Sequence, residues 1–228
     1  MDLPDHVAII PDGTRRWARK RGLPEILGAK AGAENMHRIV EYLLGAGIRY
    51  LTVWGFSTDN WKRPPEQVSF LFEQIQAWIE RDGPWLHSRG VRLHHIGRMD
   101  RLPQDLQRAI SHWGEVTQQN TGMTLIAAVD YSGRAEVIDA IRRVIEAGIT
   151  PKMVNNDLFS RYLYTDSIPD VDLVIRTSGE LRLSNFMLWQ TAYSEYYFTE
   201  VLWPDFDTKE LDKALLCYSG RMRRLGGD

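Results

Sequence analysis

The chain has 228 residues, 43% of them hydrophobic and 25% charged, and a net charge of −2, which suits one globular domain and gives no basic stripe for nucleic-acid binding. Cys217 is the only cysteine, so an intrachain disulfide is excluded and a reducing compartment, the cytoplasm, is expected. We expect no signal peptide, because a predicted strand begins within a few residues of Met1, and no apolar run long enough to cross a bilayer is present.

Strand-like and helix-like segments alternate along the chain. The predicted strands are His6–Ile10, Tyr50–Phe56, Val91–Ile96, Met123–Val129, Leu173–Thr177 and a short candidate at Val201–Trp203. The predicted helices are Gly32–Ala46, Glu66–Arg89, Pro103–Gln119, Arg134–Ala147, Asn156–Leu163 and Thr208–Arg224. Strands separated by helix-length connections predict a parallel sheet covered on both faces, and therefore a single α/β domain.

A polar run, 11–18, directly follows the first predicted strand. Gly13 allows a tight turn that brings backbone N–H groups close to a ligand. Asp12 is unusual there, because a carboxylate beside a phosphate repels it unless a cation such as Mg²⁺ lies between them. The alternative is that Asp12 is an ordinary helix N-cap.

A second polar run follows the apolar stretch 173–175. It contains two arginines and several hydroxyls, of which Arg176, Arg182 and Ser184 are the main candidates. Such groups just past a strand end can surround an anion with several charged oxygens, and a diphosphate is the natural candidate. The alternative is a solvated loop with two surface arginines.

Four predicted strands deliver a polar residue immediately after their last apolar position. These residues are Asp12, Ser57, Asp130 and Arg176. Open α/β sheets bind ligands at the carboxyl ends of their strands. We therefore expect one site at that edge of the sheet.

The two polar runs, together with 56–64 (Phe-Ser-Thr-Asp-Asn-Trp-Lys-Arg-Pro), resemble those of the cis-prenyltransferases, the family of undecaprenyl diphosphate synthase. The resemblance continues through 188–190, 192–198 and 201–206 and covers essentially the whole chain. It implies an α/β fold with a six-stranded, mostly parallel sheet, an apolar tunnel, and a homodimer with the segment Ala192 to Trp203 near the contact. It also implies an enzyme that condenses an allylic diphosphate with isopentenyl diphosphate to a Z-prenyl diphosphate, releasing diphosphate. A greasy product would allow peripheral membrane association.

The resemblance also implies roles for individual residues. Asp12 matches the aspartate that positions Mg²⁺, and Glu195 matches a carboxylate linked to the metal site. The loop expected to hold the allylic diphosphate contains Gly13, Thr14, Arg15, Arg16 and Trp17. The isopentenyl diphosphate cradle is expected from Arg176, Arg182 and Ser184. The segment that closes over substrate contains Ser57, Asn60, Trp61 and Arg63, with Asn60 expected to help remove the proton. Arg224 and Gly226 match an element that reaches the partner subunit's site.

The sequence departs from the family at the allylic site. Thr14 and Arg15 replace an Asn-Gly pair, Glu25 stands where an Arg is common, and Ala29 stands where a His is common. One hypothesis is that Arg15 supplies the missing cation; the alternative is that Arg15 and Glu25 form an exposed ion pair. The altered site could also accept dimethylallyl groups in both positions and give irregular, non-head-to-tail products.

The helix Glu66–Arg89 is expected to face the growing prenyl chain. Its bulky residues are Phe70, Phe72, Ile75, Trp78 and Ile79, which either form plain core or limit the tunnel. Each added isoprene needs its own apolar volume, so short products of roughly C10 to C20 are predicted. A non-catalytic subunit of a prenyltransferase is the rival hypothesis, and the retained Asp12, Arg16 and Arg176 argue against it.

Overall fold

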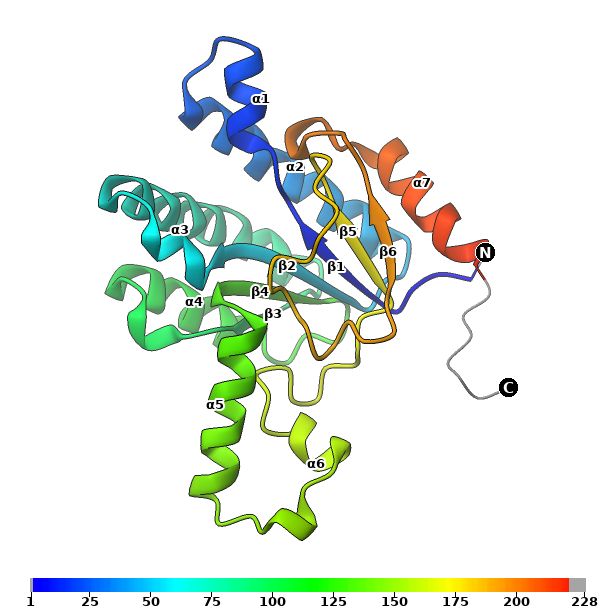
Figure 1. Cartoon of the computed structure of the whole chain (residues 1–228). Helices are drawn as coiled ribbons and strands as arrows, with labels where there is room; N and C mark the ends of the chain where they lie inside the picture. Colours follow the sequence, from blue (N-terminus) through cyan, green and yellow to red (C-terminus); the bar gives the residue numbers. More distant parts are fainter. Residues whose placement is uncertain (1, 222–228) are drawn as a thin grey trace.

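Six parallel strands form one sheet in the order β3-β4-β2-β1-β5-β6 (Figure 1). The computed structural model describes residues 2–221. The strands are β1 (His6–Ile10), β2 (Tyr50–Ser57), β3 (Arg92–Ile96), β4 (Thr124–Tyr131), β5 (Leu173–Arg176) and β6 (Glu195–Phe198). The predicted α/β class, the parallel sheet and its first five strands are therefore confirmed.

The sixth strand was predicted at the wrong place. It is Glu195–Phe198, which pairs with β5, whereas Val201 to Trp203 crosses the carboxyl ends of the strands. The Val201 carbonyl accepts the Ser178 N–H, and the Trp203 N–H donates to the Asp12 carbonyl. The backbone groups of Val201 and Trp203 therefore bond to loop residues rather than to a strand. Pro204 has no N–H to donate to a neighbouring strand, so this segment does not extend the sheet.

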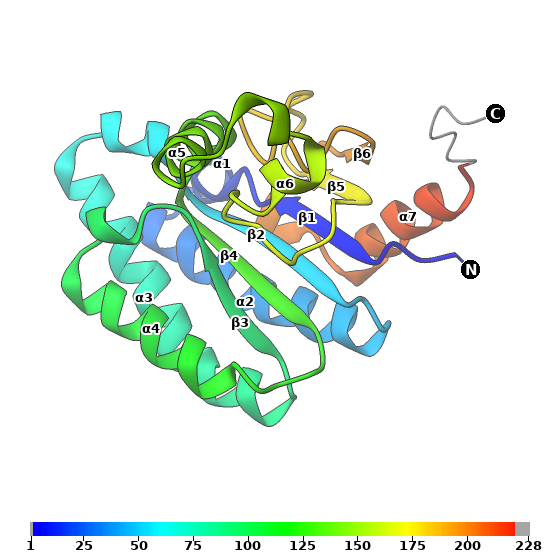
Figure 2. The same ribbon diagram turned by 90° about the horizontal axis from the view of Figure 1, so that it is seen from below.

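The helices lie on both faces of the sheet, as Figure 2 shows with α2, α3 and α4 below it and α5 and α6 above. They are α1 (Thr14–Lys20), α2 (Glu25–Gly45), α3 (Pro65–Ser88), α4 (Gln104–Thr117), α5 (Gly133–Glu146), α6 (Asn156–Ser160) and α7 (Thr208–Ser219), with short 3₁₀ turns between some of them. The larger core packs α2, α3, α4 and α7 against one face. Within residues 2–221, no helix has both the length and the apolar character needed to cross a membrane.

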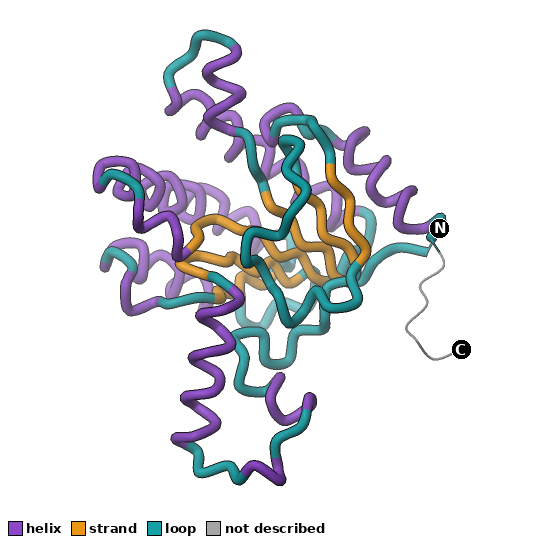
Figure 3. The backbone as a smooth tube through the Cα atoms, in the orientation of Figure 1, coloured by secondary structure: helices purple, strands orange, loops and turns teal. Residues whose placement is uncertain are grey.

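The other face of the sheet is covered largely by the loop between β5 and β6, drawn in teal in Figure 3. Phe186 and Met187 of this loop are fully buried against Ala8, Ile126 and Val174 of the strands. The loop that carries part of the candidate site is therefore anchored by the hydrophobic effect rather than left free.

Helix α2 begins two turns before its predicted start at Gly32. Pro24 precedes its first residue, and Gly28 lies where a Cβ would come 2.6 Å from the Thr14 carbonyl oxygen. The glycines that weaken the helical pattern in the sequence are there because α1 packs closely on this end of α2. The predicted ends of α3, α4 and α5 lie within two residues of the observed ends. Helix α6 ends at Ser160, before its predicted end at Leu163. Helix α7 ends at Ser219, and its predicted end, Arg224, lies outside the described residues.

His95 of β3 is a buried residue that can titrate, so it makes the stability of the fold depend on pH. Its Nε2 lies 3.0 Å from the Val129 carbonyl oxygen, and burial lowers the pKa of the ring to about 4. In the unfolded chain the pKa is ~6.5, so the unfolded state binds the proton more tightly. The contribution of His95 to stability is therefore intact above pH 6.5 and is lost as the pH falls toward 4.

We predict that the wild type loses about 2 kcal/mol more of its free energy of unfolding between pH 7 and pH 5 than the His95→Gln variant does. Urea titrations of both proteins at the two pH values measure this difference. Equal losses in the two proteins would contradict the buried, neutral state of His95.

Candidate active site

A cavity of about 830 Å³ opens at the carboxyl edge of the sheet and continues between the sheet and helices α2 and α3. Its polar wall comes from Asp12, Arg15, Arg16, Arg19, Glu25, Ser57, Asn60, Arg63, Arg176 and Ser184. Its apolar wall comes from Met36, Val53, Leu71, Ile75, Trp78, Ile79, Leu125, Ala127 and Val129. The apolar residues lie farther back along the strands and α3, so charge is concentrated at one end of the cavity.

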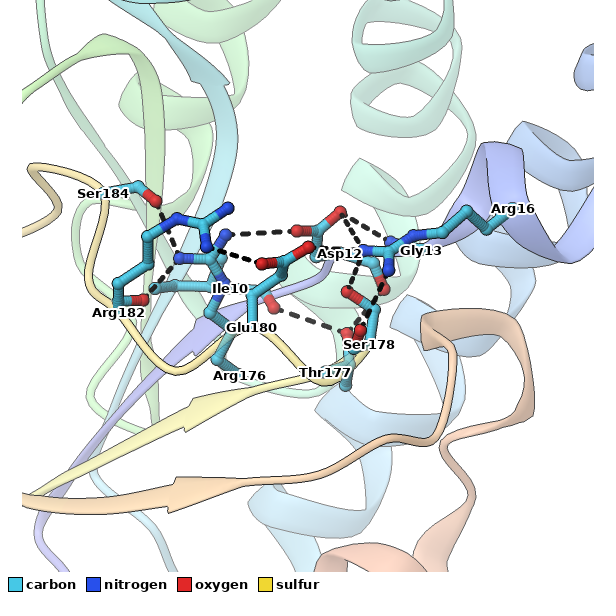
Figure 4. Close-up of polar contacts among 10 residues, drawn as sticks. All are labelled: Ile10, Asp12, Gly13, Arg16, Arg176, Thr177, Ser178, Glu180, Arg182 and Ser184. Carbon is cyan, nitrogen blue, oxygen red and sulfur yellow. Dashed lines mark hydrogen bonds and ion pairs between the residues drawn. The ribbon is translucent and has the colours of Figure 1, made fainter.

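Asp12 leaves β1 and turns its carboxylate toward two cations (Figure 4). Its Oδ1 accepts the Gly13 N–H at 2.8 Å, and its Oδ2 lies 3.2 Å from Arg176 Nη2. The Thr177 hydroxyl donates to the Asp12 carbonyl at 2.6 Å and ties the loop to the end of β5. Helix α1 is capped by Gly13 and has no side-chain cap bond, so the N-cap alternative for Asp12 is wrong.

Arg176, the last residue of β5, is the most buried cation of the site. It is 5% exposed and stands beside Ile10 in the sheet register. Its Nη1 donates to the Ser184 hydroxyl at 2.8 Å and to the Arg182 carbonyl. Its Nε is buried without a hydrogen-bond partner within residues 2–221. Arg176 lines the cavity, and a buried guanidinium at a cavity wall is suited to an anionic ligand.

Arg16 reaches the same point from α1. Its Nη1 and Nη2 donate to the Ser178 carbonyl and hydroxyl at 3.0 and 2.6 Å, and its Nη2 lies 3.8 Å from Asp12 Oδ1. Ser178 adopts φ +79°, a costly conformation for a residue with a Cβ. Glu180 lies 3.4 Å from Arg16 and 2.6 Å from Arg182, so one carboxylate connects the two arginines.

Two of the departures from the family, Arg15 and Glu25, meet in one ion-pair cluster with Arg19. Glu25 contacts Arg15 at 2.9 Å and Arg19 at 3.0 Å, so the predicted Arg15–Glu25 pair is confirmed. All three residues also line the cavity, so Arg15 has a path to a ligand. Burial lowers the pKa of Arg63, and the nearby charge of Arg15 lowers it further. Cations crowded in this way favour binding of an anion.

The segment after β2 forms a 3₁₀ helix, η1 (Thr58–Lys62), with its own cap. The Ser57 hydroxyl accepts the Asp59 N–H, and the Asn60 side-chain oxygen accepts the Ser57 N–H, both at 3.1 Å. Ser57, Asn60 and Arg63 line the cavity. The Asn60 oxygen is thus committed to the cap in this structure.

The cavity gathers ten of the sequence-predicted site residues and leaves four out. It is lined by Asp12, Gly13, Thr14, Arg15, Arg16, Ser57, Asn60, Arg63, Arg176 and Ser184, but not by Trp17, Trp61, Arg182 or Glu195. Trp17 donates to Asp205, and Trp61 donates to Asp130, so both indoles are used in packing. Arg182 is 61% exposed beside the site. Arg224 and Gly226 lie outside the described residues.

Glu195 does not meet Asp12 within one chain. It starts β6 opposite Leu173, whereas Asp12 follows Ile10, which is in register with Arg176 at the other end of β5. Three strand residues separate these ends by ~10 Å along the sheet. Glu195 instead pairs with Arg221. Within residues 2–221, no group of three His, Cys, Asp or Glu side chains could hold a metal.

Asp12 on its own fits a magnesium ion that is held largely by its ligand. Its side chain is 37% exposed at the cavity. Its Oδ1 accepts the Gly13 N–H and its Oδ2 accepts from Arg176 Nη2, so each oxygen keeps a lone pair. Mg²⁺ in phosphate sites is bound through one or two carboxylates, several waters and substrate oxygens. The residues present therefore fit the ion.

Four polar residues of the wall were not predicted as site residues. Arg19 is in α1, Asp59 is in η1, and Gln67 and Gln74 are in α3. The glutamines are seven residues apart and share a helix face with Leu71, Ile75 and Trp78, so helical periodicity could have found them. Of the bulky residues of α3, four line the cavity, namely Phe70, Ile75, Trp78 and Ile79. Phe72 takes the core alternative and packs against Phe56 and Trp61, with ring centroids 4.5 and 5.3 Å apart.

The chain is similar to several known proteins along its whole length. The family model described as "Putative undecaprenyl diphosphate synthase" matches residues 10–226. An isoprenyl transferase from Fusobacterium nucleatum subsp. nucleatum is 47% identical and covers 99% of this chain and 97% of its own. Lavandulyl diphosphate synthase from Lavandula x intermedia, solved with dimethylallyl diphosphate, is 38% identical, covers 98% of each chain and has a TM-score of 0.94. A structure from Campylobacter jejuni, described as a probable undecaprenyl diphosphate synthase, is 30% identical, covers 99% of this chain and 100% of its own, and has a TM-score of 0.84.

Gly13 makes the loop geometry testable. It has φ +105°, and a Cβ there would lie 2.8 Å from Leu202 Cδ2 and 2.9 Å from Ser178 Cβ. We predict that Gly13→Ala lowers the free energy of unfolding by about 2–3 kcal/mol, from backbone strain plus overpacking. Urea unfolding measures the loss.

Gly47 provides the matched control. It has φ +84°, and a Cβ there would meet nothing within 4 Å. Gly47→Ala should therefore show the backbone cost alone, about 1 kcal/mol. Equal losses in the two variants would mean that the close packing around Gly13 contributes nothing.

Proposed function

The chain belongs to the undecaprenyl diphosphate synthase family of prenyltransferases and is an enzyme of that kind, and on this premise we propose that it joins an allylic diphosphate to isopentenyl diphosphate in the cavity described above. The observation that carries the proposal is that Arg16 and Arg176 converge on Asp12 at the charged end of an otherwise apolar cavity. Two diphosphate head groups fit the charged end, and their hydrocarbon tails fit the apolar end.

The two diphosphates have separate supporting residues. Arg16, with Arg15 and the Gly13 loop, would bind the allylic diphosphate. Arg176 and Ser184, which are hydrogen-bonded to each other, would bind the isopentenyl diphosphate, with Arg182 at the rim. Asp12 contacts both arginines and therefore lies between the two subsites.

In the reaction, the allylic C1–O bond breaks, a bond forms between C1 and the terminal carbon of isopentenyl diphosphate, and a proton leaves the latter. Negative charge grows on the departing diphosphate, where the Arg16 guanidinium stabilises it. The apolar wall excludes water from the carbocation-like carbon. The Asn60 amide is uncharged and a poor base, so it orients the reacting group, and the proton passes to a diphosphate oxygen.

We assign Asp12 as the protein ligand of Mg²⁺. Bound there with a diphosphate, the ion would neutralise charge on the leaving group. Since Glu195 lies at the far end of the sheet, it is not proposed as a second ligand from the same chain. The homodimer, a cytoplasmic location and membrane association through the product stay predictions.

The size of the cavity favours a short product. At roughly 25 Å³ per non-hydrogen atom, scaled from the ~30 Å³ share of a liquid water, two diphosphates fill about half of the cavity. The rest of its 830 Å³ holds about three isoprene units, in keeping with the C10 to C20 range. Trp78 and Ile79 of α3 would limit further growth.

One observation favours a second candidate reaction. The lavandulyl diphosphate synthase was solved with dimethylallyl diphosphate and superposes with a TM-score of 0.94. In the present chain the ion pairs of Glu25 with Arg15 and Arg19 change the proposed allylic subsite. The alternative reaction is therefore the coupling of two dimethylallyl groups.

We predict that purified protein with Mg²⁺ converts labelled isopentenyl diphosphate and one of the dimethylallyl, geranyl, farnesyl or geranylgeranyl diphosphates to a Z-prenyl diphosphate of ~C10–C20. Chromatography of the labelled products gives their length. EDTA should abolish turnover, and Asp12→Asn should lower the rate by ~10²–10³. Product from dimethylallyl diphosphate alone would establish irregular coupling, and no product with any donor would refute the proposal.

Arg15 is predicted to bind the allylic diphosphate. Arg15→Ala should raise the allylic KM about 10-fold, the effect of one lost charge-assisted contact of ~1.4 kcal/mol, and leave the isopentenyl KM unchanged. Steady-state kinetics with each substrate varied in turn measures both. An unchanged allylic KM would show that Arg15 serves only as the partner of Glu25. Lys20→Ala, which removes an exposed cation of the same helix, is the control.

A further inference from the structure

Asp130 is a buried carboxylate outside the cavity for which the proposed reaction gives no role. It lies near the end of β4, its side chain has no exposed area, and its backbone adopts φ +50°. The burial raises the pKa of this carboxyl, although Trp61, Arg101 and Arg98 act against the rise. An ionisable group kept in a strained and desolvated position needs a structural or functional reason.

Its partners come from two other elements. Asp130 Oδ1 accepts the Trp61 indole N–H at 2.8 Å. Its Oδ2 lies 3.2 Å from Arg101 Nε, in an ion pair whose geometry is not that of a hydrogen bond. The Arg101 guanidinium stands 5.0 Å from the centroid of the Trp61 ring. Trp61 is thus held through its N–H by a carboxylate and on its ring by a cation.

Trp61 in turn fixes the segment that lines the cavity. Asn60 precedes it, Arg63 follows two residues later, and both line the cavity wall, whereas Asp130, Trp61 and Arg101 do not. The Arg63 N–H donates to the Asn60 carbonyl at 3.0 Å, so the turn is continuous from one lining residue to the other. Any shift of the Trp61 ring would move both.

We propose that Asp130 and Arg101 clamp Trp61 and thereby position Asn60 and Arg63 against the diphosphate ligands. This role rests on the proposed function. Asp130 is a positioning residue, since it acts through Trp61 and touches no ligand.

The test compares Asp130→Asn, Trp61→Phe, their double variant and Asp139→Asn. Asp139→Asn is the control, because Asp139 is a carboxylate, 16% exposed, that also pairs with arginines, and its partners are Arg98 and Arg142 rather than Trp61 or Arg101. Each protein is measured for the hydrogen exchange rates of the Asp59 and Arg63 amides, for the Kd of inorganic diphosphate with Mg²⁺, and for kcat and KM.

We expect Asp130→Asn and Trp61→Phe each to speed exchange of these amides and to raise Kd and KM about 10-fold, with a smaller change in kcat, as misplaced binding groups do. The double variant should agree with the more impaired single variant within ~2-fold, because both changes act on one contact: Asp130→Asn removes the charge from the carboxylate that accepts the Trp61 N–H, and Trp61→Phe removes the N–H itself. Asp139→Asn should match the wild type. Trp61→Phe keeps an aromatic side chain but lacks the indole N–H that Asp130 accepts. This variant therefore tests the clamp if Asp130→Asn does not fold.

Two results would overturn the clamp: unchanged exchange in both single variants, or faster exchange with unchanged Kd and KM. A loss of active protein alone would lower the apparent kcat and leave KM unchanged, which would also count against positioning. If the wild type turns over no substrate, the proposed function fails, and the exchange rates together with the Kd of diphosphate still decide the clamp.

Discussion

The contact between Arg176 and Asp12 organises the rest of the site. A guanidinium that is 5% exposed cannot stay buried without a partner, and Asp12 is the carboxylate within reach at 3.2 Å. This pair joins the ends of β1 and β5, which are neighbours in the sheet. Thr177, hydrogen-bonded to the Asp12 carbonyl, and Ser184, hydrogen-bonded to Arg176, fix the two loops around it. The proposed diphosphate subsites are therefore arranged around an ion pair that the sheet itself positions.

The second constraint is the division of the cavity into a charged end and an apolar end. Parallel strands end together, so their polar residues meet at one edge, while the apolar residues of the same strands continue beneath it. Helix α3 supplies the opposite wall through one helical face. Diphosphates bind where cations gather, and hydrocarbon fits where none are present, which is the division that a prenyl diphosphate requires.

The charges at the proposed allylic subsite differ from those at the proposed isopentenyl subsite. Arg176 is buried and bonded to fixed groups, whereas Arg15 and Arg19 are exposed and paired with Glu25. A ligand must compete with Glu25 for these two arginines, and exposed pairs of this kind are weak. The proposed allylic subsite is thus the more adaptable of the two, and the residues that depart from the family there, Arg15 and Glu25, are the ones proposed to affect which allylic donor binds.

The sequence alone determined the α/β class, five of the six strands and ten of the residues that line the cavity, because hydrophobic periodicity and the polar residues after each strand are local properties. It misplaced the sixth strand, since whether Val201 to Trp203 or Glu195 to Phe198 pairs with β5 depends on register across the sheet. Only the tertiary structure turned Trp17 and Trp61 away from the cavity and separated Glu195 from Asp12. Side-chain direction and the end of a strand at which a residue stands are set by packing between distant segments, and no local pattern encodes them.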